Sequence, residues 1–210
     1  MLILASGSPR RRQLLACLGL PFRVVVPNVD EDVLSAADLT PDEMAETLAN
    51  AKALSVAQRE HDGLVLAADT LVVDADTVLG KPGDAAEAAA MLRRLRDREH
   101  RVITGLALVD AGRSNLSLVH HVTTAVRMRP YSDDEMAAYI ARGEPFDKAG
   151  AYAIQDEAFH PVASYDGCYC NVVGLPLRAV IHLLRQGGVD ITDEHLAGLP
   201  AECGPCPVEV

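Results

Sequence analysis

The sequence predicts an α/β fold: a mixed, twisted sheet with flanking helices, in a single two-lobed domain with a central cleft. Three observations support this. In the first 70 residues, short apolar segments alternate with helical patterns, as in parallel strands joined by helices. Residues 101–109 and 116–128 are long strand-like stretches joined by a turn, which indicates an antiparallel hairpin. The chain has 210 residues, 49% of them hydrophobic, and can bury one sizeable core.

The first segment is a strand that passes through small residues into a helix. Residues 2–5 are apolar, Ser8 is a suitable N-cap, and Pro9 suits the first helical position, where its missing N–H costs nothing. Leucines recur at helical spacing until Gly19. The N–H groups of the first turn, the helix dipole and the arginines at 10–12 would converge on one place, which favours a phosphate site. The alternative is a solvated basic turn.

A second strand is predicted at residues 22–26, and Pro27 ends it. The acidic loop at 28–32 follows. Its Glu31 is either a metal-binding carboxylate or part of a solvated turn.

Residues 40–43 have the pattern of a capping box with proline at the first helical position. They predict a helix that runs to about Glu60. Its apolar stripe is expected to consist of Met44, Leu48, Ala51 and Ser55. Lys52 falls on an adjacent face near the middle of this helix.

Residues 64–68 form a continuous apolar strand, which we expect to be buried on both faces and to end at Asp69. Open α/β sheets bind ligands at the carboxyl ends of such strands. This favours a functional Asp69 over a helix cap or a turn residue. Residues 71–74 and 77–79 then predict a hairpin.

The later segments predict three more helices. One covers residues 84–98, with a buried stripe of Met91, Leu92 and Leu95. A second capping box starts a helix at 132–142, and the last helix is expected at about 177–186. Beyond it the pattern fades, so the chain divides into a domain at 1–186 and a C-terminal tail at 187–210.

The composition restricts the kinds of binding partner and indicates the cellular compartment. The net charge of -11 argues against a nucleic-acid backbone or an anionic membrane as the main partner. No apolar run approaches the ~20 residues of a membrane span, so a cytoplasmic protein is expected. The five cysteines indicate free thiols in a reducing compartment. The alternative is a site that combines residues 168–170 with Cys203 and Cys206.

Only three of the 19 basic residues are lysines, namely Lys52, Lys81 and Lys148. In a background this rich in arginine, positions that keep lysine are candidates for a compact, flexible ammonium group. The alternative is that the three lysines remain at these positions by chance.

These residues offer what phosphoanhydride hydrolysis needs: cations for the phosphates, a divalent ion and a carboxylate. The candidate cationic wall consists of Arg10, Arg11, Lys52, Lys81 and Lys148. Glu31 and Asp69 are hard oxygen ligands for Mg²⁺ or Mn²⁺. The sequence has no Gly-x-x-x-x-Gly-Lys-[Ser/Thr] phosphate loop, no Gly-x-Ser-x-Gly elbow and no His-Glu-x-x-His motif, which argues against the enzyme classes built on them.

Five segments carry a family resemblance, in the order Leu4–Arg11, Ala68–Thr70, Gly80–Pro82, Asp147–Tyr152 and Gly174–Leu177. On these motifs, which span most of the chain, the sequence resembles the Maf family of nucleoside triphosphate pyrophosphatases. The resemblance implies hydrolysis of a small-molecule nucleotide to nucleoside monophosphate and pyrophosphate, and a homodimer.

The resemblance also implies residue roles. Asp69 matches the proton acceptor that activates water for attack at the α-phosphorus. The positions that match phosphate- and metal-binding residues are Ser8, Arg11, Glu31, Lys52 and Lys81, and Lys148 lies within a further motif. The positions that match base-specificity residues are Arg10, Thr70 and Gln155.

The base preference follows from one motif. Family members with Tyr-Gly-Ile-Gln act on dTTP and UTP, and this chain has Tyr152-Ala153-Ile154-Gln155. We therefore expect dTTP, UTP or modified pyrimidine nucleotides as substrates, although Ala153 replaces the glycine. The alternative function is a non-catalytic, nucleotide-binding regulator of cell division, because the family was named for an effect on septum formation. A phosphatase or a nucleotidyltransferase is a third alternative.

Overall fold

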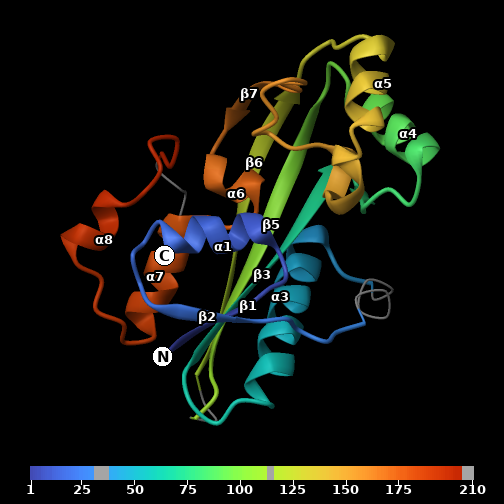
Figure 1. Cartoon of the computed structure of the whole chain (residues 1–210). Helices are drawn as coiled ribbons and strands as arrows, with labels where there is room; N and C mark the ends of the chain where they lie inside the picture. Colours follow the sequence, from blue (N-terminus) through green and yellow to red (C-terminus); the bar gives the residue numbers. More distant parts are fainter. Residues whose placement is uncertain (31–37, 113–115, 205–210) are drawn as a thin grey trace.

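The structure, a computed structural model, describes residues 1–30, 38–112 and 116–204. It contains a seven-stranded sheet (Figure 1). The strands follow the order β2 (Phe22–Val25), β1 (Leu2–Ala5), β3 (Leu64–Asp74), β5 (Glu99–Asp110), β6 (Ser117–Met128) and β7 (Val162–Asp166), and β4 (Thr77–Leu79) pairs with β3.

The sheet is mixed, as predicted. β1 pairs in parallel with β2 and β3, whereas β3, β5, β6 and β7 pair in antiparallel fashion. The β5–β6 hairpin confirms the two long strands predicted from the sequence, and β3 and β4 form the expected second hairpin.

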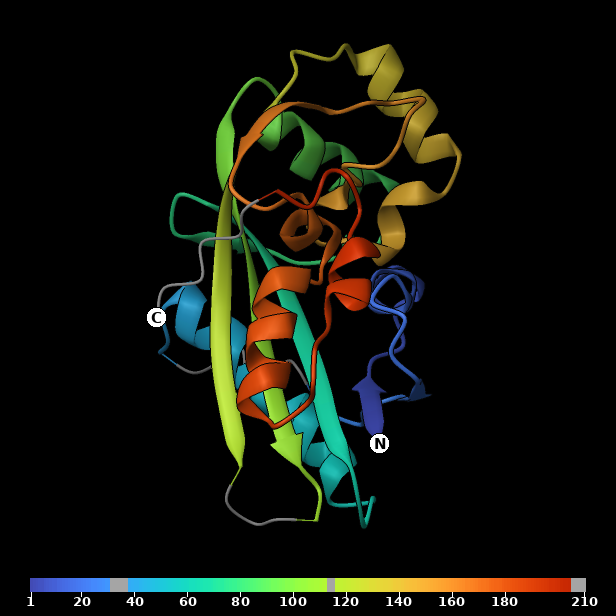
Figure 2. The ribbon, with the colours of Figure 1, turned by 90° about the vertical axis from the view of Figure 1, so that its left-hand side faces the viewer.

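Helices cover both faces of the lower part of the sheet, and Figure 2 shows α3 and α7 on opposite sides of it. α3 (Pro41–Ala57) packs on side chains such as Ile3 and Val65. α1 (Pro9–Ala16) and α7 (Leu177–Gln186) pack on the alternate residues, including Leu4 and Leu66. Because side chains of a strand alternate between its faces, one apolar strand supplies both cores.

The upper lobe is built around the far ends of the long strands β3, β5 and β6 (Figure 1). Its core contains side chains of α4 (Ala85–Leu95) and α5 (Asp133–Ala141), including the predicted stripe Met91, Leu92 and Leu95. Two 3-10 helices, η1 (Glu144–Asp147) and η2 (Ala149–Ala151), lie beside it. The shared strands connect the two lobes into one α/β domain.

Asp69 does not end its strand, contrary to the prediction. β3 continues to Asp74, because β5 pairs with it along most of its length and β4 pairs with its last residues. The parallel neighbour β1, however, ends at Ala5, opposite Ala67. Asp69 therefore lies just beyond the carboxyl end of the parallel pair, although it lies inside a strand.

The buried face of α3 also differs from the prediction. The capping box of Thr40 and Glu43 is present, and the helix ends at Ala57 instead of about Glu60. The side chains that the structure buries are Ala45, Leu48, Ala49, Lys52, Ala53 and Val56. Of the predicted stripe, only Leu48 is buried, because α3 approaches the sheet closely through its alanines. Lys52 thus lies on the buried face, with 7% of its surface exposed.

Two short helices were not predicted. α6 (Tyr169–Val173) precedes α7, and α8 (Asp193–Ala197) follows it, so α7 is not the last helix. Ile191 and Cys203, from the predicted tail, are buried in the core that contains α7. The division of the chain at residue 187 stays a prediction.

Within the described residues, no helix combines the length and the apolar character that a membrane crossing needs.

The contact between α3 and β5 depends on Gly105. A Cβ atom on this residue would lie 2.1 Å from the main-chain oxygen of Ala45. We therefore expect Gly105→Ala to lower the free energy of unfolding by about 3 kcal/mol, because helix and strand would have to move apart. Chemical denaturation measures this change.

Gly80→Ala is the matched control, because a Cβ atom there would meet nothing within 4 Å. Its free energy of unfolding should stay within about 0.5 kcal/mol of the wild type. Equal effects of the two substitutions would contradict the close-approach argument.

Candidate active site

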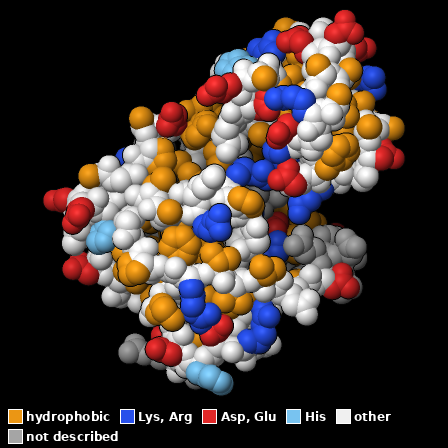
Figure 3. Space-filling model, in the orientation of Figure 1, with side chains coloured by type: hydrophobic (Ala, Val, Ile, Leu, Met, Phe, Trp, Pro, Cys, Tyr) orange, Lys and Arg blue, Asp and Glu red, His pale blue; other side chains and the backbone are white. Residues whose placement is uncertain are grey.

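A cavity of about 650 Å³ lies between the two lobes, within the size range of small-molecule sites. Lys and Arg side chains gather around the hollow in Figure 3. The predicted site residues that line it are Ser8, Arg10, Arg11, Lys52, Asp69, Thr70, Lys81, Lys148 and Gln155. The remaining predicted residue, Glu31, lies outside the described residues.

The end of β1 explains why residues on both faces of β3 reach one cavity. β1 pairs with β3 only as far as Ala67, and β4 pairs with it from Val72 onward. Between these points, this edge of β3 has no strand partner in the described structure. Asp69 faces α3 and Thr70 faces the α1 side, and both line the cavity at the open edge.

The junction of β1 and α1 has the predicted form. The Ser8 hydroxyl accepts a hydrogen bond from the main-chain N–H of Arg11, and Pro9 occupies the first helical position. Arg10 and Arg11 line the cavity, but Arg12 is exposed and does not. The junction thus directs two of its three arginines into the site.

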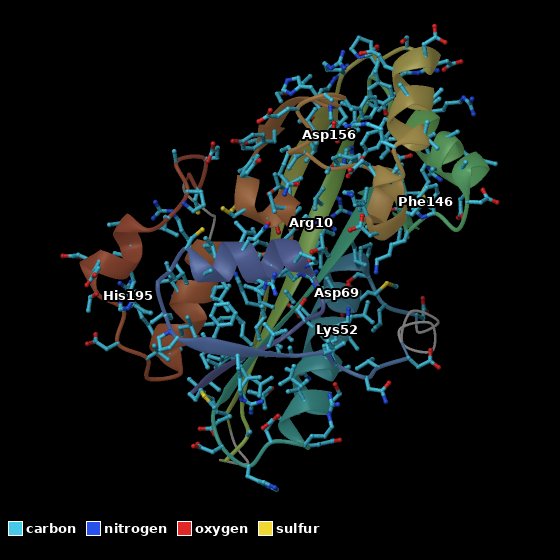
Figure 4. All side chains as sticks on the ribbon, in the orientation of Figure 1. Arg10, Lys52, Asp69, Phe146, Asp156 and His195 are labelled. Carbon is cyan, nitrogen blue, oxygen red and sulfur yellow. The ribbon has the colours of Figure 1, made fainter. Side chains whose placement is uncertain are left out.

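Asp69 and Lys52 form a buried ion pair at the base of the cavity. Lys52 Nζ lies 2.5 Å from Asp69 Oδ1, and each side chain is 9% exposed. Figure 4 shows the two side chains next to each other, on α3 and β3, with Arg10 above them. Removing Lys52 would leave the buried carboxylate of Asp69 without this cation, so the pair holds the carboxylate in one position.

Arg11 joins three segments. Its Nη2 donates to Thr70 Oγ1 at 3.0 Å, and its Nε donates to the main-chain oxygen of Gly174 at 2.9 Å. The first contact reaches β3, and the second reaches the C-cap of α6. Arg11 is therefore a structural cross-link as well as a cation of the cavity.

Asp147 connects the lobes across the cavity. Its Oδ2 accepts from Arg10 Nη1 at 2.9 Å, and its Oδ1 accepts from Lys148 Nζ at 2.7 Å. Burial alone would raise the pKa of Asp147, but the hydrogen bonds from Lys148 and Arg10 outweigh it and lower the pKa. Asp147 was not predicted as a site residue, although it opens the Asp147–Tyr152 motif.

The same motif builds the upper wall. Gly150 has a φ of +67°, and a Cβ atom there would lie 2.8 Å from a methyl carbon of Val72. Its N–H donates to the main-chain oxygen of Gly80, next to Lys81. Only glycine suits this conformation and this contact, so the motif fixes the wall that carries Lys81.

Tyr152, also in the wall, contacts a buried histidine. Its hydroxyl lies 2.7 Å from His100 Nε2. Burial lowers the pKa of His100 to about 4, although nearby Asp74 acts in the opposite direction. His100 Nδ1 has no hydrogen-bond partner among the described residues, so a second ring proton would be buried without an acceptor.

The chemistry of the site suits an anionic ligand. Cations surround the cavity, and one carboxylate is held at its base. The described residues contain no cluster of three His, Cys, Asp or Glu side chains that could hold a metal ion. Mg²⁺ commonly uses one or two protein carboxylates together with substrate phosphates, and Asp69 fits that kind of site.

The predicted alternative cysteine site is not tested by the structure. Cys206 lies outside the described residues, and Cys17, Cys168, Cys170 and Cys203 form no disulfide with one another.

Comparison with known proteins identifies relatives over nearly the whole chain. Residues 1–187 match the family model described as Maf-like protein. A dTTP/UTP pyrophosphatase of Thermomicrobium roseum is 52% identical over 207 residues, which cover 99% of this chain and 93% of that protein. The dTTP/UTP pyrophosphatase of Symbiobacterium thermophilum is 50% identical over 190 residues, which cover 90% of this chain and 95% of that protein.

The His100 environment predicts an acid-sensitive fold. Because the pKa is lowered in the folded state, the unfolded chain binds more protons between pH 6.5 and about 4. The contribution of His100 to stability is therefore complete above pH 6.5 and is lost as the pH falls toward 4. Between pH 7 and pH 4.5 we expect a loss of about 2 to 3 kcal/mol from this residue.

Denaturation of the wild type and of His100→Gln at the two pH values isolates this contribution, because glutamine can still bond to Tyr152 but does not titrate. The variant should lose less stability than the wild type. Equal losses would show that other groups cause the acid sensitivity.

Proposed function

This chain belongs to the family of Maf-like proteins, and from that premise we propose that it hydrolyses nucleoside triphosphates to nucleoside monophosphate and pyrophosphate. The relatives named dTTP/UTP pyrophosphatase support dTTP and UTP as its substrates. The observation that carries the proposal is the buried carboxylate of Asp69, held by Lys52 at the base of a cavity lined by cations.

Asp69 is the proposed proton acceptor. It takes a proton from a water molecule as the water oxygen bonds to the α-phosphorus, and the bond from the α-phosphorus to the bridging oxygen breaks to release pyrophosphate. The ion pair with Lys52 supports this role, because it fixes the carboxylate at the cavity surface before substrate arrives.

The cations are proposed to bind the phosphate chain. Lys81 is exposed at the mouth of the cavity, after β4, and its ammonium group can follow a flexible anion. Arg10 and Lys148 are held by Asp147 across the two lobes. Positioned cations of this kind stabilise the charge that develops on the leaving pyrophosphate.

A divalent cation, Mg²⁺ or Mn²⁺, is part of the proposal. Asp69 and Glu31 are the residues expected to hold it, and carboxylate oxygens are the ligands these ions prefer. When bound, the ion would neutralise phosphate charge.

Gln155 is the proposed contact to the base. It lines the cavity, and its amide has both donors and an acceptor, which suits a pyrimidine edge with neighbouring C=O and N–H groups.

Asp69→Asn should lower kcat/KM for pyrophosphate release by roughly 100-fold or more, with binding of the triphosphate largely kept. The amide cannot accept the proton, and the loss of one negative charge does not weaken the attraction of the site for the triphosphate. The assay measures monophosphate and pyrophosphate from a panel of canonical and modified nucleoside triphosphates with Mg²⁺ or Mn²⁺.

Asp76→Asn, in the exposed turn between β3 and β4, is the control and should match the wild type. Nucleotide binding without turnover of any triphosphate would instead support a regulatory, non-catalytic protein. Release of inorganic phosphate as the first product would indicate a phosphatase.

Gln155→Ala should change the order of substrate preference more than the maximal rate, because the base lies away from the reacting phosphorus. Competition assays with dTTP, UTP, CTP and GTP measure the ranking. Gln13→Ala, on the exposed surface of α1, should leave the ranking unchanged. The same ranking in both variants would remove Gln155 from this role.

A further inference from the structure

A chain of hydroxyl groups leads from the cavity wall into the sheet. Thr70 Oγ1, at the wall, lies 2.9 Å from Thr104 Oγ1 on β5. Thr104 Oγ1 in turn lies 3.1 Å from the main-chain oxygen of Asn171 in α6. Thr104 and Asn171 are completely buried. Arg11 Nη2 reaches the cavity end of the chain, at Thr70.

The groups at the two ends of this chain of hydroxyl groups, a carbonyl and a guanidinium, fix the direction of the hydrogen bonds. A carbonyl oxygen only accepts, so Thr104 donates its single hydroxyl hydrogen to Asn171. Thr104 can then only accept from Thr70, and Thr70 is the donor of that bond. A guanidinium only donates, so Thr70 also accepts from Arg11. The hydroxyl hydrogen of Thr70 is thereby used inside the protein.

We infer that Thr104 is a positioning residue that makes Thr70 a hydrogen-bond acceptor only, so that Thr70 selects a base with an N–H donor at ring position 3. Uracil and thymine present such an imide N–H at ring position 3. Cytosine presents a nitrogen lone pair at that position, which would face the lone pair of Thr70. The inference rests on the proposed function, because it takes a pyrimidine nucleotide as the ligand.

The remaining lone pair of Thr70 also argues against a phosphate contact. Phosphate oxygens only accept hydrogen bonds at neutral pH, so an acceptor-only hydroxyl repels them. The other cavity residues named above include five cations, Arg10, Arg11, Lys52, Lys81 and Lys148, which suit the phosphates. Thr70 is therefore matched to an uncharged donor on the ligand.

The far end of the chain is held firmly. Asn171 Nδ2 donates to the main-chain oxygen of Val102 and to Thr124 Oγ1, each at 2.9 Å. Thr124 Oγ1 also accepts from the N–H of Cys168, at the start of α6. α6 is thus attached to β5 and β6, and the carbonyl that orients Thr104 cannot turn away. Such a network fixes the direction of a hydroxyl because the groups that hold α6, Asn171 Nδ2 and Thr124 Oγ1, are both hydrogen-bonded.

Thr104→Val tests the inference, because it keeps the shape of the side chain and releases the hydrogen of Thr70. The ratio of kcat/KM for UTP to that for CTP should fall by roughly tenfold or more, mainly through KM, because the released hydroxyl can donate to the base of CTP while it still accepts from that of UTP. Thr104→Ser keeps the hydroxyl and should restore the wild-type ratio.

Thr123→Val is the matched control. Thr123 lies half-buried on β6, and its hydroxyl faces Asp42 Oδ1 on α3 at 3.5 Å, away from Thr70 and Asn171. The ratio of kcat/KM for UTP to that for CTP should stay near the wild-type value in this variant. Melting curves confirm that each variant is folded, and Thr104→Ala replaces Thr104→Val if the latter does not fold.

Calorimetric binding of the α,β-imido analogues of UTP and CTP separates this inference from the proposed function. If the wild type hydrolyses neither triphosphate, the proposed function fails, and the ratio of the two dissociation constants still tests Thr104. Equal binding of the two analogues by the wild type, an unchanged ratio in Thr104→Val, or an equal fall in Thr123→Val would each overturn the inference.

Discussion

The buried ion pair between Lys52 and Asp69 is the interaction on which the rest of the structure depends. Two opposite charges removed from water are tolerated only while they stay together. α3 must therefore lie close to the sheet, and small residues permit this, because Ala45 lies directly over Gly105. The packing of α3 on the sheet and the position of the proposed catalytic carboxylate therefore depend on each other, so a change in either alters the other.

β3 belongs to both lobes, and it carries both the proposed catalytic carboxylate and the hydroxyl proposed to select the base. Asp69 faces α3 and Thr70 faces the α1 side, so neighbours in the sequence have different surroundings. The carboxylate is fixed by one ammonium group, and the hydroxyl is fixed by a chain of neutral groups. Because β1 stops at Ala5, both reach the same cavity. A short parallel strand beside a long one thus creates the site.

Local signals made much of this predictable. Apolar runs, capping boxes and the turn between β5 and β6 involve adjacent residues, so the main helices and the strands other than β7 could be located from the sequence. The buried face of α3 could not, because it depends on how closely Ala45 approaches a glycine in a distant strand. Asp147 and Thr104 were missed for the same reason: Arg10 and Thr70, the cavity residues that they contact, are far away in sequence.

Side chains alternate between the two faces of the sheet along β3, and this alternation restricts insertions and deletions within the strand. Its start is held by a hydrogen bond from Leu64 N–H to the oxygen of Met1, and its register with β1 and β5 is continuous. One residue inserted between Leu64 and Asp69 would turn the carboxylate toward α1 and the hydroxyl toward α3. Insertions and deletions are therefore excluded from this strand by geometry, whereas exposed turns such as Ala75-Asp76 have room for them.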